Sequence, residues 1–339
     1  MASVRQIAKQ AGVSTATVSR VMNNSPQVSG EAKRKVMTVI NGVNYMPAVG
    51  KKTTTNIAYL FTDSITLSSP YDAGVMAGLS AGLEQHRLDL LILNARTCRE
   101  SGETFSQMFR RKGVQGVIIR TTAGTREACK AILESGVPAV VLGDQIEGYE
   151  EVCVDVDSRD ASRDAVEHLI GLGHRSVAFC TNIVDDKDHL DRFAGYQEAL
   201  SNAGLAFESR LMFRVPANRQ GGEQFVRRLA AMVDRPSAVF VADPATCVGM
   251  LTEARRQGID VPRDLSIVGF DDSEARFVTS PELTAVCQDS ELLGRHAMAV
   301  LMSRLTSQSL EADSARPLRA WLEVNATTAA VADAADAND

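Results

Sequence analysis

Two sets of side chains in this sequence have the types and spacings that binding chemistry requires. The first set combines hydroxyl and amide groups with one arginine and contains no acid: Ser14, Thr15, Ala16, Thr17, Ser19, Arg20, Asn23 and Asn24. On a helix, such hydroxyls and amides can reach base edges in a DNA major groove, and an arginine can hold a phosphate. This set therefore predicts contact with double-stranded DNA.

The second set lies after strand-like segments in the rest of the chain. It comprises Ser69, Tyr71, Asp72, Asp144, Asp188, Arg192, Asp243, Asp271 and Ser290. In open α/β sheets, ligands bind beyond the carboxyl ends of the strands, so these side chains predict a small-molecule site. The alternative, which stays open at this point, is that some of them cap helices or bridge two subdomains.

The first set needs short helices to present it. Apolar or small residues recur at the spacing of one buried helix face: Val4, Ile7, Ala8 and Ala11. Gly12 permits a tight turn, and Ser14 can cap a second helix. The buried side of that second helix consists of Val13, Val18 and Val21. Two short helices joined at a glycine are typical of a helix-turn-helix, and a third helix after Ser29 completes the expected all-α unit.

The second set needs parallel sheets. Strand-like runs are expected at 57–61, 89–93, 116–119, 139–142 and 152–156, and then at 177–180, 211–213, 238–241 and 266–270. Amphipathic helices are expected between them, including 74–85, 162–172, 192–203 and 245–257. Repeated βα units predict parallel sheets with right-handed crossovers. Two such series predict an α/β core of two doubly wound subdomains.

Charge divides the 339-residue chain into two parts. Residues 1–52 contain eight basic residues and one acid, a net charge of +7, whereas the remainder contains 28 basic and 41 acidic residues, a net charge of −13. A basic segment on an acidic body favours a polyanionic partner for the first segment only.

Several segments near the N-terminus form a specific pattern: Ile7-Ala8, Ala11-Gly12-Val13-Ser14, Thr17-Val18-Ser19-Arg20-Val21, Asn23, Val28-Ser29, Val36 and Asn44-Tyr45-Met46-Pro47. This pattern resembles the headpiece of the lactose-repressor/galactose-repressor (LacI/GalR) family. The resemblance implies a transcriptional repressor that binds a pseudo-palindromic operator as a homodimer. It also implies control of operator affinity by a small-molecule effector.

The resemblance continues in a core similar to periplasmic binding proteins. Its landmarks are Gly173-His174, Arg192 with Gly195-Tyr196, Val261-Pro262, Gly269-Phe270-Asp271-Asp272 and Gln288-Asp289. By resemblance, Arg192 grips effector hydroxyls or a carboxylate, and Asp271 and Asp243 accept hydrogen bonds from sugar hydroxyls. Carboxylates and arginine suit vicinal hydroxyls, so the expected effector is a carbohydrate or related metabolite. The acidic cluster at 185–188 departs from the family and is also compatible with a cationic ligand.

The linker departs from the family as well. Relatives place a short hinge helix here, which pushes a leucine pair into the minor groove. In this chain Gly50 and three threonines oppose a helix, and no leucine is present. We therefore predict a flexible linker whose Lys51 and Lys52 contact phosphates. The expected domains are a headpiece at 1–47, a linker at 48–56, one subdomain at 57–156 with 288–316, a second at 157–287 with 317–328, and a disordered acidic tail at 329–339.

Several other functions are disfavoured by what the sequence lacks. The six cysteines include no CxxC pair, and the five histidines show no metal-ligand spacing, so neither a metal nor a cofactor is expected. No GxGxxG follows the first strand, and no GxSxG elbow is present, which disfavours an enzyme. No apolar signal segment or membrane span is present, which favours a cytoplasmic protein. A solute-binding protein for sugar uptake, which would need an export signal, is one alternative that this disfavours. A sugar-processing enzyme that uses the cleft carboxylates is the other alternative.

Overall fold

The computed structural model describes residues 4–22, 28–42, 54–184, 186–271, 274–306 and 318–331. The chain forms two compact units, Met1–Thr54 and Thr55–Asp339, which we call the headpiece and the core. In the described part, no helix combines the length and apolar character that crossing a bilayer requires.

The headpiece contains the three expected helices: α1 (Val4–Ala11), α2 (Thr15–Met22) and α3 (Gly30–Gly42). Gly12, in the turn between α1 and α2, has a φ of +65°, the left-handed region that favours glycine. The three helices share one small core formed by Ile7, Ala8, Ala11, Val18, Val21, Val36 and Ile40. The predicted helix-turn-helix is confirmed.

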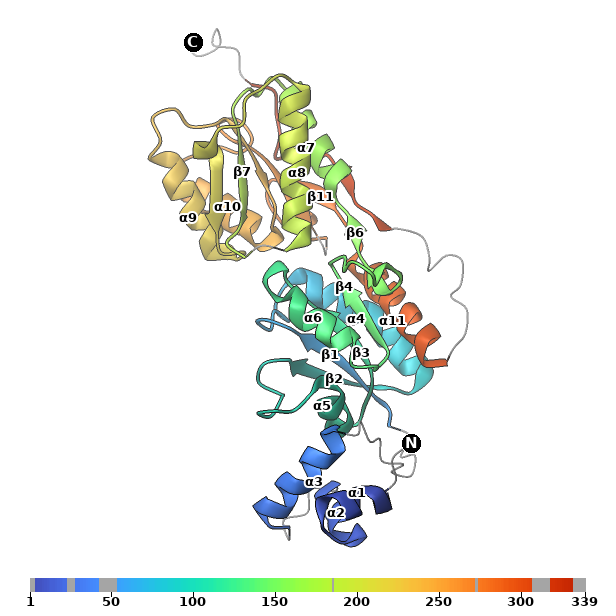
Figure 1. Cartoon of the computed structure of the whole chain (residues 1–339). Coiled ribbons are helices and arrows are strands. Elements are labelled where there is room, and N and C mark those ends of the chain that lie inside the picture. The colour runs from blue at the N-terminus through green and yellow to red at the C-terminus, as the bar shows by residue number, and fades with distance from the viewer. Residues whose placement is uncertain are drawn as a thin grey trace, which may run out of the picture. The chain divides into compact units, whose positions relative to one another are not determined.

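The first lobe of the core is a five-stranded parallel sheet in the order β2-β1-β3-β4-β5. Its strands are β1 (Asn56–Phe61), β2 (Asp89–Asn94), β3 (Val114–Arg120), β4 (Ala139–Leu142) and β5 (Cys153–Val154). Helices α4 (Pro70–His86) and α11 (Ser290–Thr306) pack on one face. Helices α5 (Phe105–Lys112) and α6 (Arg126–Leu133) cover the other. Figure 1 shows this layering.

The second lobe is a six-stranded sheet in the order β13-β11-β10-β9-β7-β8. Its strands are β7 (Val177–Asn182), β8 (Met212–Val215), β9 (Ala238–Val241), β10 (Ser266–Asp271), β11 (Thr284–Cys287) and β13 (Trp321–Glu323), of which β13 alone is antiparallel to its neighbour. Helices α7 (Arg159–Gly171) and α8 (Lys187–Asn202) cover one face. Helices α9 (Arg219–Ala230) and α10 (Pro244–Arg256) cover the other.

The chain passes between the lobes more than once. Strand β6 (Val156–Asp157) pairs in parallel with β12 (Leu318–Arg319), apart from both large sheets. Helix α11 follows β11 of the second lobe but packs on α4 of the first, and β13 then returns to the second sheet. The predicted α/β core, in which helices cover both faces of the sheet in each of two subdomains, is confirmed. The exact domain boundaries stay a prediction.

The strand predictions needed correction at the edges. The expected strand 152–156 is two short strands, because Asp155 separates β5 from β6. Strands β11, β12 and β13 were not expected, since each has only two to four residues. Four short turns of 3₁₀-helix complete the described elements: η1 (Ala123–Thr125), η2 (Glu150–Val152), η3 (Ser209–Leu211) and η4 (Ala275–Phe277).

Glycines set the close approach of α4 and α11. A Cβ atom on Gly78 would collide with the backbone carbonyl of Glu291, and one on Gly294 would collide with the carbonyl of Val75. One turn further along α4, a Cβ on Gly82 would meet only the flexible side chain of Met298. A backbone carbonyl cannot move aside as a methionine side chain can. We therefore expect position 78 to tolerate alanine less well than position 82 does.

We expect Gly78→Ala to lower the free energy of unfolding by about 1–3 kcal/mol through overpacking. For the matched control Gly82→Ala we expect little change in the free energy of unfolding. The higher helix propensity of alanine, worth about 1 kcal/mol, offsets the cost of moving the Met298 side chain. Thermal unfolding of the full-length variants measures the difference. Equal midpoints for the two variants would show that Gly78 does not set the helix spacing.

Candidate functional site

The second headpiece helix presents most of the predicted DNA-binding residues. The Ser14 hydroxyl oxygen accepts a hydrogen bond from the amide of Thr17 at 3.0 Å and thereby caps α2. Val18 and Val21 face the headpiece core. The predicted contact residues that are exposed are Ser14, Thr15, Ala16, Ser19 and Arg20, and Thr17 is half-buried. The helix therefore offers a continuous polar face with one cation.

Some predictions for the headpiece cannot be compared with the structure. Asn23, Asn24, Lys51 and Lys52 lie outside the described residues, and so do the linker from 48 to 53 and the tail from 332 to 339. The expectation that this chain lacks a hinge helix also falls on that linker.

In the core, Asp72 anchors the loop after β1. Its carboxylate accepts hydrogen bonds from Tyr59 Oη at 2.7 Å, Thr66 Oγ1 at 2.5 Å and Ser69 Oγ at 2.7 Å. Ser69 also caps α4 by accepting a bond from the Asp72 amide. These two predicted site residues are thus joined to one another, and together they fix the first turn of α4, which carries Tyr71.

Tyr71, Arg120 and Asp188 converge on Gly143. A Cβ atom placed on Gly143, whose φ is +68°, would lie 2.9 Å from Arg120 Nη1, 3.0 Å from Tyr71 Oη and 3.7 Å from Asp188 Oδ2. The Arg120 guanidinium stacks on the Tyr71 ring with 4.3 Å between its carbon and the ring centroid. Tyr71 and Arg120 belong to the first lobe and Asp188 to the second. The three side chains therefore mark the junction between the lobes.

On the second lobe, Arg192 lies beside this junction. Its guanidinium carbon is 3.5 Å from the centroid of the Phe270 ring, and its Nη1 donates to the carbonyl of Ala242 at 2.5 Å. Its Nη2 lies 4.0 Å from Asp188 Oδ2. Burial, together with the neighbouring carboxylates of Asp155 and Asp186, raises the pKa of Asp188 to about 7 against the lowering effect of Arg192 and Arg120.

The acidic cluster at the start of α8 is neutralised from within. His189 lies between two carboxylates, with Nδ1 2.6 Å from Asp186 Oδ1 and Nε2 3.0 Å from Asp243 Oδ1. Burial opposes the charged ring, yet the Asp243 and Asp186 carboxylates raise the pKa of His189 to about 10. The charge of His189 thus offsets part of the negative charge at the start of α8, while Asp185 lies outside the described residues.

Four buried polar atoms around the junction have no hydrogen-bond partner among the described residues: Tyr71 Oη, Arg120 Nε, Arg192 Nε and Asp243 Oδ2. Arg120 Nε faces Asp72 Oδ1 at 3.5 Å, which is too long for a strong hydrogen bond. Unpaired buried polar groups are costly and uncommon, so a group of them at one place indicates a binding site for a hydrogen-bonding molecule.

Three predicted residues lie in other surroundings. Arg126 holds the Asp144 carboxylate at both oxygens, at 2.6 and 2.9 Å. Arg276 donates to Asp271 Oδ2 at 2.8 Å. Ser290, the first residue of α11, packs against Gly74 of α4. The structure therefore gives Asp144 and Asp271 an ion-pair partner of their own, and their roles toward a ligand stay predictions.

Arg120 was not among the predicted site residues. It is the last residue of β3, at the strand end where ligands of parallel sheets bind. The rule that selected the other candidates could have found it.

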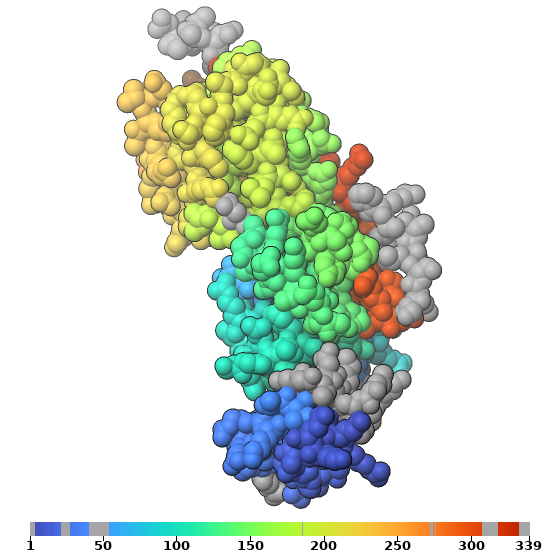
Figure 2. All heavy atoms as spheres, in the orientation of Figure 1, coloured from blue at the N-terminus to red at the C-terminus, as the bar shows by residue number. Residues whose placement is uncertain are grey.

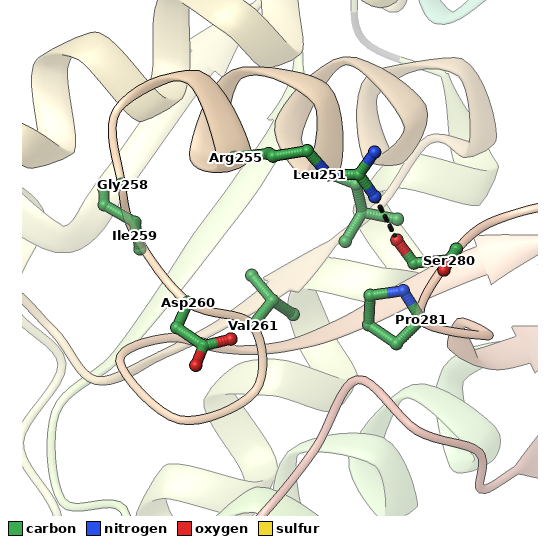
Figure 3. Close-up of a pocket in the computed structure, with 8 residues that line it drawn as sticks. All are labelled: Leu251, Arg255, Gly258, Ile259, Asp260, Val261, Ser280 and Pro281. Atoms are coloured by element: carbon green, nitrogen blue, oxygen red, sulfur yellow. Dashed lines mark hydrogen bonds between the residues drawn. The ribbon is translucent and has the colours of Figure 1, made fainter.

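Two pockets are found that are not lined by Tyr71, Arg120, Arg192 or Asp243. One, of about 380 Å³, is lined by Gln145, Asp155, Asp157, Arg159, Lys187, Asp191 and Leu318, beside the β6–β12 pair. There Lys187 Nζ of α8 bridges to Asp155 Oδ2 at 2.7 Å, and the atoms of the two lobes meet (Figure 2). The other, of about 400 Å³, lies on the second lobe, where Arg255 donates to the carbonyl of Ser280 (Figure 3).

Comparison with known proteins identifies the family. The description "Bacterial regulatory proteins, lacI family" matches residues 3–48, and "Periplasmic binding protein-like domain" matches residues 166–324. The chain thus combines a helix-turn-helix domain of the LacI family with a periplasmic binding protein-like domain. It is a DNA-binding transcriptional regulator, as its helix-turn-helix headpiece and binding-protein-like core indicated.

Members of the LacI family match this chain over most of its length. Catabolite control protein A of Priestia megaterium is 27% identical over 316 residues, which cover 91% of this chain and 94% of that protein. The structure of the transcriptional regulator CelR in complex with cellobiose has a TM-score of 0.68 at 28% identity and covers 96% and 100% of the two chains. The lac repressor dimer bound to operator and the anti-inducer ONPF has a TM-score of 0.68 at 24% identity, covering 97% and 99%, which supports the fold.

The pKa of Asp188 gives a test of the junction. Because its folded-state pKa of about 7 exceeds the usual value, the free energy of unfolding falls as pH rises from about 4 to about 7. Asp188→Asn cannot release this proton. Relative to the wild type, we expect the variant to gain roughly 2 kcal/mol in stability between pH 5 and pH 8.

Urea unfolding at the two pH values measures this gain, with Asp234→Asn on the exposed surface of the same lobe as the control. A difference from wild type that is independent of pH would contradict the buried, partly protonated state of Asp188.

Proposed function

We propose that this regulator binds a pseudo-palindromic operator through α2 and that an uncharged carbohydrate, bound at the junction of the core lobes, controls its operator affinity. The observation that carries the effector site is the group of four buried, unpartnered polar atoms on Tyr71, Arg120, Arg192 and Asp243. A polyol can donate hydrogen bonds to Asp243 and Asp188 and accept them from the two arginines. The same hydroxyl group can do both, which suits a site that mixes donors and acceptors.

The charge balance supports a neutral ligand. Asp186 and Asp243 share the His189 ring, and Asp72 is surrounded by hydroxyl donors and Arg120. These pairings leave no large excess of either charge among these residues, which favours an uncharged ligand. The cellobiose complex of CelR, a relative at 28% identity, supports the same ligand class.

We assign the predicted residues to two roles. Tyr71, Asp188, Arg192 and Asp243, together with Arg120, contact the effector. The other predicted residues stay candidate effector contacts: Ser69, Asp72, Asp144, Asp271 and Ser290. In the headpiece, hydroxyl groups and Arg20 on α2 contact DNA.

The regulation follows from linkage. An effector that touches side chains of both lobes binds one lobe arrangement more tightly than another, and the difference in affinity shifts the equilibrium between arrangements. A coupling of about 1–3 kcal/mol to the operator-binding state changes DNA affinity roughly 5–150-fold.

We also propose a homodimer that acts in the cytoplasm, because helix-turn-helix proteins read two half-sites with two headpieces. Exposed apolar side chains of the second lobe, including Val248, Phe277 and Val278, are candidates for contacts with the second copy. Relatives of this chain are transcriptional regulators, and this favours regulation over a solute-binding or sugar-processing role.

The role of Arg20 at the DNA can be tested on a generic 30-base-pair duplex. We expect Arg20→Ala to weaken binding severalfold and to reduce the slope of log affinity against log salt by about 0.9 for each phosphate that the variant no longer neutralises. Fluorescence anisotropy at several salt concentrations measures both quantities. Arg235→Ala, on the exposed surface of the core, should change neither, and a wild-type slope for the Arg20 variant would remove this residue from the interface.

The effector site can be tested by thermal-shift screening of the full-length protein against cellobiose, glucose, ribose and related uncharged sugars, followed by calorimetric titration. For any sugar that binds, we expect Arg192→Gln to weaken affinity about 10–150-fold, the effect of removing a charged hydrogen bond. Arg175→Ala, an exposed residue of the same lobe, is the control. If Arg192→Gln binds that sugar like the wild type, the ligand lies elsewhere.

A further inference from the structure

The environment of His189 points to a role that sequence motifs do not reveal. The ring is buried, and each of its nitrogens lies within hydrogen-bond distance of a carboxylate oxygen, Asp186 Oδ1 at 2.6 Å and Asp243 Oδ1 at 3.0 Å. Ionised carboxylates only accept hydrogen bonds, so both ring nitrogens must carry a proton. With both acids ionised, the geometry places a charged imidazolium between them.

The two acids occupy corresponding positions in the fold. Asp186 is the N-cap residue of α8 and Asp243 is the N-cap residue of α10, and these helices follow β7 and β9, which are neighbours in the sheet. Asp186 also caps its own helix, because its side chain accepts from the amide of His189. The His189 ring thus ties together the first turns of two helices at the edge of the sheet that faces the junction.

Asp243 depends on this bridge for its orientation. Its side chain makes no capping hydrogen bond to α10, and its second oxygen, Oδ2, has no partner among the described residues. His189 is the residue that holds the other oxygen. One oxygen is therefore fixed by the ring, while the other is left available.

We propose that His189 is a positioning residue of the effector site, whose imidazolium holds Asp243 with one carboxylate oxygen directed at the effector. This role rests on the proposed function of the junction. The other charged groups that face the cluster are Arg120 from β3, which interacts with Asp186, and Asp188 and Arg192 from α8. A planar ring with two opposed donors suits the task, because it joins two carboxylates in a single fixed geometry.

The charge of the ring can be tested without a ligand. In the full-length protein labelled with ¹⁵N-histidine, we expect both nitrogens of His189 to remain protonated at pH 8, about 1.5 units above the usual histidine pKa. His168 and His174, whose pKa burial lowers, should be neutral at that pH. A neutral His189 ring at pH 8 would overturn the proposal.

Its action through Asp243 can be tested by a double-mutant cycle. Calorimetry would measure the binding of cellobiose, glucose and ribose to the wild type, His189→Gln, Asp243→Ala and the double variant. We expect His189→Gln to weaken binding at least tenfold on its own and to have no further effect once Asp243 is alanine. Additive losses, or unchanged binding by His189→Gln, would overturn the positioning role alone.

Two further variants complete the test. His168→Gln is the matched control, since His168 belongs to the same lobe and bonds Thr328 away from the junction, and it should bind sugar as the wild type does. If His189→Gln does not fold, Asp186→Asn breaks the other side of the bridge and should weaken binding in the same direction. If none of the sugars binds the wild type, the proposed ligand class fails and this role fails with it.

Discussion

The structure depends on how charged side chains are neutralised where the two lobes of the core meet. Burying an ionised group is expensive unless a partner of opposite charge or a set of hydrogen bonds replaces water. Several of the buried acids here have such partners: the Asp72 carboxylate accepts hydrogen bonds from three hydroxyl groups, and the His189 ring lies between the carboxylates of Asp186 and Asp243. What these pairings leave unsatisfied is a small set of donors and acceptors, and that remainder defines the candidate effector site.

The direction of the strands explains why these groups meet. In each lobe the strands that carry the site run parallel, so their carboxyl ends lie at one edge and the following loops share that edge. Position along the sequence was therefore enough to predict Arg192 and Asp243, because both follow strand-like runs. Arg120, the last residue of β3, meets the same criterion, although it was not among the predicted residues.

Other features of the site could not be predicted from the sequence, for physical reasons. Whether a carboxylate is available to a ligand depends on side-chain geometry, as the pairing of Asp144 with Arg126 shows. The bridge joins His189 to Asp243, 54 residues further along the sequence, and it requires that α8 and α10 begin after neighbouring strands. The major elements were predictable because their apolar periodicity is local. The short strands β11, β12 and β13 were not, because their existence depends on partners supplied by the rest of the fold.

The same pairings bear on how a ligand signal could travel. Contacts within the second lobe hold its junction face in place. The His189 ring of α8 contacts Asp243 at the start of α10, and Arg192 packs on Phe270 and donates to the Ala242 carbonyl. Links between the lobes are slighter, including the two-residue β6–β12 pair and the Lys187–Asp155 bridge. We therefore expect a ligand that contacts Arg192 on one lobe and Tyr71 on the other to move the lobes relative to one another more easily than it deforms either lobe. In the proposed mechanism, the binding free energy of such a ligand shifts the lobe arrangement, and this shift is what linkage to DNA affinity requires.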